Sequence, residues 1–360
     1  MMKSVEAEMR DRGVSWLLSS DSPSIRFWVL RDLLGRREDD SEVGETRKEL
    51  LSWGPIQGVL REQHVEGYWG EPEDVYWPKW NATVWPLILL AEMGIPGDTP
   101  QVKRGCEYFL RVMDEQDRSW PPNFPENDPQ RKWDGYRSVW EPCVTGNMAR
   151  TLTFFGFSED RRVREMYEWL VRTQLPDGGW NCQPGEWQKE VFHSSFMSTV
   201  EPLWAFSELP LEKWPKNGKE TVAKACEFML MHKLYKSDKT GKVIQEPWTK
   251  LHFPLFYEYD VLHGLRVLTT LGFGKDDRTR DALDLLLSKR LPDGTWPMED
   301  SYLNGPRRNL SKDSVTGEWS VVSGERVASI PEIYSSLGSI GQSNPWITLN
   351  ALRVLTGRRT

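Results

Sequence analysis

The sequence predicts an all-α fold in which inner and outer helices alternate along the chain and close into a double ring. The first observation behind this prediction is a repeated turn, Gln174-Leu-Pro-Asp-Gly-Gly-Trp180, whose Leu-Pro-Asp-Gly core and Trp return at residues 289–296. Weaker copies lie at residues 63–69 and 113–120. A motif that recurs at intervals of tens of residues is typical of a helical array.

The second observation is that two kinds of helical segment alternate between these turns. One kind is apolar around its whole circumference, as expected of a helix buried on all sides, and comprises residues 24–35, 81–94, 144–156, 195–209, 259–272 and 345–357. The other kind is charged on one face, as expected of an outer helix, and comprises residues 3–18, 43–62, 99–114, 160–174, 218–234 and 277–290. Because residues 3–18 would pair with the last inner helix, the two chain ends would meet and seal the ring, which removes the need for capping repeats.

The whole chain, residues 1–360, is predicted to form a single barrel domain, since a closed repeat array can reach this length as one unit. Residues 297–343 do not fit the helix pairing and are rich in Gly, Ser, Pro and charge. A long irregular insertion in a compact domain is usually either functional or disordered. At the mouth of the barrel it is a candidate lid.

Composition excludes several classes of partner. The net charge of -7 is dispersed, with no Lys/Arg-rich block, which argues against nucleic acid as a partner. No apolar run approaches the roughly 18 residues that a transmembrane helix needs, and the start of the chain lacks the apolar core of a signal peptide. We therefore expect a cytoplasmic protein with a small-molecule ligand, apolar or sugar, and leave its oligomeric state open.

The turn at residues 174–180, in which the Gln, the Asp-Gly pair and the Trp occur together, resembles the repeat of squalene/hopene cyclases and of protein prenyltransferase β subunits. Over nearly the whole chain the resemblance implies their fold, the (α/α)6 toroid, and structural roles for Gln174 and Trp180 in joining an outer helix to the next inner one. The chain departs from the cyclases because it has no Asp-x-Asp-Asp acid motif and no room for a second helical domain. Squalene cyclisation is therefore not expected.

The resemblance to prenyltransferase β subunits also implies a zinc site, which those proteins build from an Asp-x-Cys pair and a His. At the matching places this chain has Glu141, Cys143, Cys182 and His193, with Glu in place of Asp and a looser spacing. Thiolate, imidazole and carboxylate are ligands that suit Zn²⁺, the candidate cofactor. The alternative is that the two cysteines are small buried apolar residues and the His is simply hydrogen-bonded.

Aromatic residues are abundant, with 19 Trp, 13 Phe and 10 Tyr, and many lie where the inner helices begin. Corner packing explains most of them, but a lined cavity would use the same residues. The candidate ligand-binding residues are Trp77, Trp80, Trp85, Trp140, Tyr257, Tyr259 and Trp346. Aromatic walls suit isoprenoid chains, whose carbocations π faces stabilise, and also sugars.

Four ionisable residues are candidates for catalysis. Asp260 and His263 are three residues apart and therefore share one helix face, so that Asp260 could orient His263 as an acid–base pair. The alternative is that Asp260 caps its helix and His263 is a hydrogen-bonded core residue. His252 and Glu201 have the same two interpretations.

Three functions are compatible with these patterns. The leading hypothesis is an enzyme or binder that acts on an isoprenoid or similarly apolar ligand in the central cavity. The second is carbohydrate processing by a lyase or glycosidase, which predicts an open groove with paired carboxylates or a Tyr beside a His. The third is a non-enzymatic scaffold, which predicts a filled barrel and an exposed apolar patch.

Overall fold

The computed structural model describes residues 2–72, 75–76, 79–118, 141–182, 193–301, 303, 308–312, 319–323 and 332–357. In these ranges the protein is predominantly helical, as the sequence predicts. The inner segments form α2 (Pro23–Trp28) continued by η1 (Val29–Leu33), α5 (Val84–Glu92), α8 (Pro142–Phe154), α10 (Phe196–Glu208), α12 (Val261–Thr270) and α14 (Pro345–Thr356). The outer segments form α1 (Met2–Leu18), α3 (Ser41–Ser52), α4 (Gly54–Arg61), α6 (Pro100–Arg118), α9 (Arg161–Arg172), α11 (Gly218–Met231) and α13 (Arg280–Ser288). Short 3-10 turns follow or precede several of these helices: η2 (Leu211–Lys213), η3 (Glu246–Thr249) and η4 (Asp277–Thr279).

One predicted outer helix is two helices in the structure. The sequence pattern indicates a single helix over residues 43–62, whereas α3 ends at Ser52 and α4 begins at Gly54. Trp53, between them, has extended backbone torsions, and Pro55 occupies the first turn of α4. Proline cannot donate the amide hydrogen bond that would continue α3, but it is tolerated in the first turn of a helix, where that amide has no partner, so a new helix starts here.

The inner helices pack on one another in chain order. α8 contacts both α5 and α10, α10 contacts α12, and α12 contacts α14, which in turn contacts α2 and η1. A hydrogen bond of 2.8 Å from the Trp28 indole nitrogen to the carbonyl oxygen of Glu92 joins the first inner helix to α5. Every residue of α5 is buried, whereas α9 buries only a stripe at helical spacing, consistent with inner and outer roles.

The repeated turn makes the same hydrogen bonds in each of its described copies. The Trp180 indole nitrogen donates to the carbonyl oxygen of Leu170 in α9, at 2.8 Å, and its backbone amide donates to the Thr199 hydroxyl in α10, at 3.1 Å. Trp69 and Trp296 repeat both bonds with their own outer and inner helices. The Trp therefore joins an outer helix to the following inner one.

The Gln and Gly of the turn contact the next outer helix instead. The Gln174 side chain donates to the carbonyl oxygen of Thr221 in α11, at 2.7 Å, so it does not reach the following inner helix as the family resemblance implies. Gly178 has a φ of +103°, and a Cβ there would lie 2.5 Å from the carbonyl oxygen of Lys224 in α11. Only glycine combines that torsion with so close an approach.

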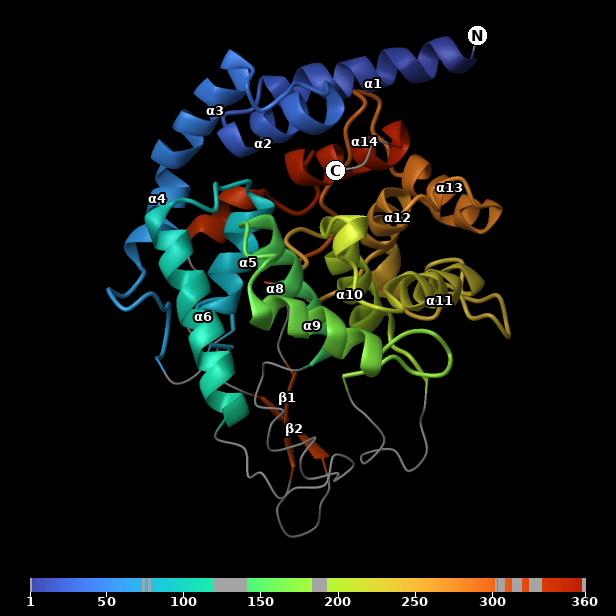
Figure 1. Cartoon of the computed structure of the whole chain (residues 1–360). Helices are drawn as coiled ribbons and strands as arrows, with labels where there is room; N and C mark the ends of the chain where they lie inside the picture. Colours follow the sequence, from blue (N-terminus) through green and yellow to red (C-terminus); the bar gives the residue numbers. More distant parts are fainter. Residues whose placement is uncertain are drawn as a thin grey trace.

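The same turn contact closes the two ends of the chain. In the last copy a Cβ at Gly294 would lie 2.5 Å from the carbonyl oxygen of Met9, so α1 stands where the next outer helix would be. Figure 1 shows α1, α2 and α14 side by side at the top of the molecule, and all three pairs are in contact. The predicted meeting of the chain ends follows from this packing.

The insertion contains the only strands of the described residues. β1 (Arg308–Lys312) and β2 (Trp319–Ser323) form an antiparallel hairpin, followed by η5 (Glu332–Leu337), which packs on α4. Figure 1 places the hairpin at the end of the molecule away from α1. In the ranges given above, none of the helices has the length and apolar character that crossing a bilayer requires.

Candidate functional site

A recessed cavity lies between the inner helices. Its wall combines residues of α5, α10, α12 and α14 with the loop 252–256 that leads into α12. The cavity has a volume of about 40 Å³. Since about 10–15 Å³ suffices for one water molecule, the cavity is narrow but not filled.

His263 lies on the cavity wall and is hydrogen-bonded to a fully buried carboxyl group. Its Nε2 is 3.1 Å from Oε1 of Glu201, which lies on α10 and is 0% exposed. Burial raises the pKa of Glu201, although His263 opposes this effect. The other carboxyl oxygen, Oε2, is buried and has no hydrogen-bond partner in the described part of the chain. The pair can therefore hold and exchange a proton beside the cavity.

Asp260 is not the partner of the His263 imidazole. Its Oδ1 accepts from the backbone amide of His263, at 2.8 Å, which is the geometry of a helix cap, and its Oδ2 accepts from the backbone amide of His252, at 2.9 Å. The predicted Asp260–His263 couple is thus corrected to Glu201–His263. His252 lines the cavity with Asp260 and directs Nδ1 to the carbonyl oxygen of Lys250, at 2.8 Å.

The predicted aromatic residues mostly form a second layer behind the cavity wall. Two rings of the loop, Phe253 and Phe256, line the cavity. Trp346 stacks on Phe253 with ring centroids 4.8 Å apart, and Trp80 stacks on Phe256 at 4.6 Å. Trp85 meets the edge of Phe256, and Tyr257 packs against Trp80 and Trp85. These four predicted residues therefore do not line the cavity themselves. They support Phe253 and Phe256, which do.

The remaining aromatic predictions fall elsewhere. Tyr259 is fully buried, donates from its hydroxyl to the carbonyl oxygen of Leu234 at 2.7 Å, and packs against Phe196 and Trp248. It is not among the residues that line the cavity. Trp77 and Trp140 lie outside the described residues.

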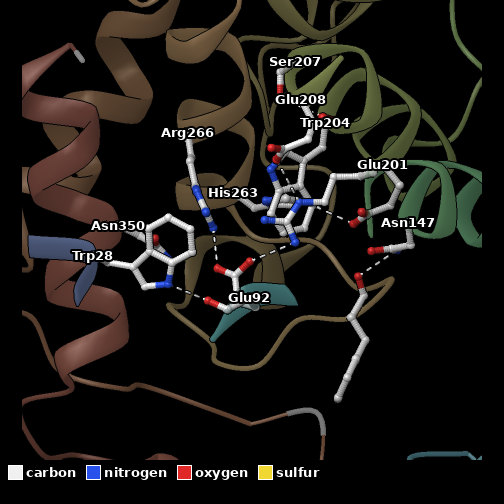
Figure 2. A network of polar contacts seen from close by, with 12 residues as sticks. Trp28, Glu92, Asn147, Glu201, Trp204, Ser207, Glu208, His263, Arg266 and Asn350 are labelled. Carbon is white, nitrogen blue, oxygen red and sulfur yellow. Dashed lines mark hydrogen bonds and ion pairs between the residues drawn. The ribbon is translucent and has the colours of Figure 1, made fainter. Parts of the chain in front are cut away.

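One end of the cavity is bordered by a group of charged side chains, one from each inner helix, all buried except Glu208, whose side chain is 28% exposed. This ionic cluster consists of Asp32 (η1), Glu92 (α5), Arg150 (α8), Glu208 (α10), Arg266 (α12) and Arg353 (α14). Arg266 donates to Glu92 at 2.7 Å, and Arg353 pairs with Asp32. Figure 2 shows how the side chains of Arg266 and Trp28 converge on Glu92. Of the cluster, Glu92 and Arg266 line the cavity.

The cluster fixes the charge of Glu92. Burial alone would raise the pKa of its carboxyl group, but Arg266, Arg150 and Arg353 together lower that pKa to about 2. The Trp204 ring, which also lines the cavity, lies between two guanidinium groups, 4.1 Å from that of Arg150 and 4.9 Å from that of Arg266. Cation–π attraction thus adds to the ion pairs.

Three of the four predicted metal ligands lie together in a thiol cluster, defined here as Glu141, Cys143 and Cys182. Their ligand atoms are all within 4.8 Å of one another, and the two sulfur atoms are 3.0 Å apart. His193 is exposed and is not part of this group. The hydrogen bond from Cys182, and then burial, raise the pKa of Cys143 well above its ordinary value, and burial raises the pKa of Glu141.

The thiol cluster has the donor chemistry of a zinc site. Two thiolates and a carboxylate suit Zn²⁺, and three protein ligands leave one coordination position open. In tetrahedral coordination with Zn–S bonds of about 2.3 Å, two sulfur atoms stand roughly 3.8 Å apart. Cys143 and Cys182 are closer than this, so the sulfur atoms would separate by less than about 1 Å to admit an ion. The residues fit the metal, and zinc binding stays a prediction.

The ionic cluster was not expected from the sequence. The inner segments read as uniformly apolar, yet each carries a charged residue within about two turns of its end, such as Arg266 in Leu265-Arg-Val-Leu268 and Arg353 in Leu352-Arg-Val-Leu355. A charge recurring in one region of successive buried helices could have indicated a shared buried network, because an isolated buried charge is too costly to be tolerated.

Comparison with known proteins identifies no family. No family model and no curated protein matches the chain. Among solved structures, the chain is similar to a protein from Actinoplanes, with 20% identity, 98% of this chain and 99% of that chain covered, and a TM-score of 0.46. It is also similar to the type II terpene cyclase MstE from Scytonema, with 13% identity, 97% and 96% coverage, and a TM-score of 0.44. A variant of MstE in complex with geranylgeranyl dihydroxybenzoate matches with 12% identity, 86% and 97% coverage, and a TM-score of 0.31.

Proposed function

We propose that the protein binds a small, predominantly apolar molecule, such as an isoprenoid, in its central cavity and transfers a proton to or from it. The observation that carries this proposal is that His263 stands on the wall of a cavity lined by apolar and aromatic side chains while it is hydrogen-bonded to the buried Glu201. We also propose that the helices form the (α/α)6 toroid of the sequence prediction, supported by the ordered packing of the inner helices and the contact of Gly294 with α1.

Each part of the proposed site has a separate role. Trp204, Phe253 and Phe256 supply aromatic faces, and Ile88 and Leu262 supply aliphatic surface, against which an apolar ligand can pack. Because burial raises the pKa of Glu201, its carboxyl group keeps a proton to higher pH than an exposed glutamate does. Its hydrogen bond to His263 offers that proton a path to the cavity, so the reaction class is acid–base chemistry on the bound molecule, such as double-bond isomerisation.

The size of the cavity limits the ligand. The cavity volume of about 40 Å³ is well below the roughly 300–1,000 Å³ of typical small-molecule sites. A ligand therefore enters only if lining side chains move apart. We therefore expect a slender molecule, such as a ten-carbon prenyl chain, to fit better than a polycyclic one.

Carbohydrate processing is less well supported. The two carboxyl groups on the cavity wall are both engaged by protein groups, Glu92 by Arg266 and Asp260 by the backbone amides of His252 and His263. They therefore do not form the facing pair that glycoside hydrolysis uses. The scaffold hypothesis predicts a filled barrel, and the cavity is an observation against it.

Deuterium incorporation tests the proposal without knowledge of the product. Geraniol incubated with the protein in D₂O should gain deuterium at carbon, detectable by mass spectrometry. The gain should disappear in Glu201→Gln and His263→Ala. Tyr259→Phe is the matched control, because it alters a buried polar residue that lies just before the helix of His263 and does not line the cavity. Incorporation that persists in both site variants would refute the acid–base role.

A further inference from the structure

The end of the cavity at the ionic cluster carries guanidinium donors that the protein does not satisfy. Arg266 lines the cavity and is 6% exposed, and its Nη1 donates to Glu92 while its Nε is buried with no hydrogen-bond partner within the described ranges. Behind it Arg150 is 3% exposed, and neither its Nε nor its Nη1 forms a hydrogen bond there. An unsatisfied buried donor is costly, and more so when it is charged.

The carboxylates near these two arginines do not satisfy all their donors. Oxygen atoms of Glu208 and Glu92 lie 3.4 and 3.5 Å from Arg150, in directions that give no hydrogen bond. Oε2 of Glu92 is likewise buried without a hydrogen-bond partner in the described ranges, so these ion pairs are not completed by hydrogen bonds. Nε of Arg266 and both Nε and Nη1 of Arg150 are therefore left as unsatisfied charged donors.

The third arginine of the cluster has no such unsatisfied donor. Arg353 donates Nε and Nη2 to Asp32 and Nη1 to Asn350, the latter at 2.8 Å. Its charge is therefore paired, and it does not line the cavity. The unsatisfied donors belong to Arg150 and Arg266, whose guanidinium groups both lie over the ring of Trp204 at the cavity wall.

We infer that the cavity takes an amphiphilic ligand with a single carboxylate head group, which binds at Arg266 with Arg150 behind it. The apolar body of the ligand extends along Trp204 and Ile88 toward Phe256 at the other end of the lining. A carboxylate suits this position because it is planar, accepts parallel hydrogen bonds from a guanidinium group and supplies one negative charge. This inference rests on the proposed function and narrows its ligand from apolar molecules to apolar carboxylic acids.

A series of ligands with one apolar body and different head groups tests the inference in the wild-type protein. Geranic acid, geraniol and geranylamine share a ten-carbon prenyl chain and carry an anionic, a neutral and a cationic head group at pH 7. Titration calorimetry should give geranic acid an affinity about tenfold or more above that of geraniol, as expected for one charge-assisted hydrogen-bonded contact. Geranylamine should bind more weakly than geraniol.

Two arginine variants assign the preference to its residue. Arg266→Gln keeps hydrogen-bonding capacity but removes the charge at the cavity, so the preference for geranic acid should fall to less than about twofold while geraniol still binds. Arg353→Gln is the matched control, since Arg353 is equally buried in the same cluster but is paired with Asp32. It should keep the preference, and circular dichroism establishes that each variant is folded.

The possible results separate the inference from the proposed function. Equal binding of geraniol and geranic acid by the wild type, or tighter binding of geranylamine, overturns the carboxylate inference and leaves apolar binding standing. A preference for the acid that survives in folded Arg266→Gln overturns the assignment to this residue. If none of the three molecules binds, the proposed function fails as well. The wild-type series is decisive even if Arg266→Gln does not fold.

Discussion

Alanine at Gly178 should destabilise the protein far more than alanine at Gly156, although both glycines have positive φ. The φ torsions are +103° and +89°, so each substitution forces alanine into a left-handed backbone, which destabilises the folded protein by about 1–2 kcal/mol. Because alanine also restricts the unfolded chain, each substitution regains about 0.4–1 kcal/mol of stability. The two variants therefore share a net loss of about 1 kcal/mol from the backbone alone.

The difference between the variants measures the close approach of the repeated turn to the next outer helix. Around Gly156 no atom lies within 4 Å of an added Cβ, whereas at Gly178 the Cβ would be 2.5 Å from the carbonyl oxygen of Lys224. That oxygen belongs to the backbone of α11 and cannot rotate away. Overpacking of this kind costs about 1–3 kcal/mol, so Gly178→Ala should lose about that much more than Gly156→Ala.

Urea denaturation followed by circular dichroism gives the comparison. The midpoint of Gly178→Ala should fall well below that of Gly156→Ala, with the same slope for both, since neither substitution changes the surface exposed on unfolding. Equal midpoints would show that the turn does not pack on α11 as described, and would refute the structural role assigned to the repeat.

Three further predictions concern ring closure, metal binding and pH. Gly294→Ala should lose as much stability in urea as Gly178→Ala, because its Cβ would meet α1 at the same 2.5 Å. A loss no larger than that of Gly156→Ala would mean that α1 does not pack on this turn. Elemental analysis after dialysis against Zn²⁺ should find one zinc per chain, lost in Cys143→Ser and kept in His193→Ala, whose imidazole lies outside the thiol cluster; zinc retained by Cys143→Ser would exclude the site. The pKa of Glu92 is lowered from 4.5 to about 2, so its contribution to stability is present above pH 4.5 and is lost as the pH falls toward 2. That contribution is about 3 kcal/mol. The wild type should therefore lose more stability over this pH range than Glu92→Gln does. Parallel plots of unfolding free energy against pH would contradict the ion pairs assigned to Glu92.

The helical architecture could be predicted because its signals are local. The turn repeats as a short stretch in which Asp and Gly set the backbone, and the Trp bonds to a carbonyl ten residues before it, as Trp180 does to Leu170. Apolar periodicity distinguishes inner from outer helices for the same reason. The break between α3 and α4 was missed because the apolar pattern continues across Trp53 and Pro55, although the proline signals it.

The site depends on contacts that no local pattern contains. Asp260 and His263 are near in sequence, and their spacing suggested a pair, but the carboxyl group that meets the imidazole is Glu201, 62 residues away. The thiol cluster was half predictable, because Cys143 lies in the first turn of the inner helix α8 and Cys182 precedes the inner helix α10. His193 also precedes one, but its side chain does not join them. The direction of a side chain depends on its packing, which the sequence pattern does not give.

Binding of geraniol to a variant with a filled cavity tests the central claim most directly. Ile88 lines the cavity from α5, and Ile88→Phe would place an aromatic ring in a cavity of only about 40 Å³. Titration calorimetry should show saturable, one-to-one binding of geraniol to the wild type and none to folded Ile88→Phe. Equal binding by the two proteins would mean that the ligand lies elsewhere, and no saturable binding by the wild type would contradict the proposal that this cavity holds an apolar molecule.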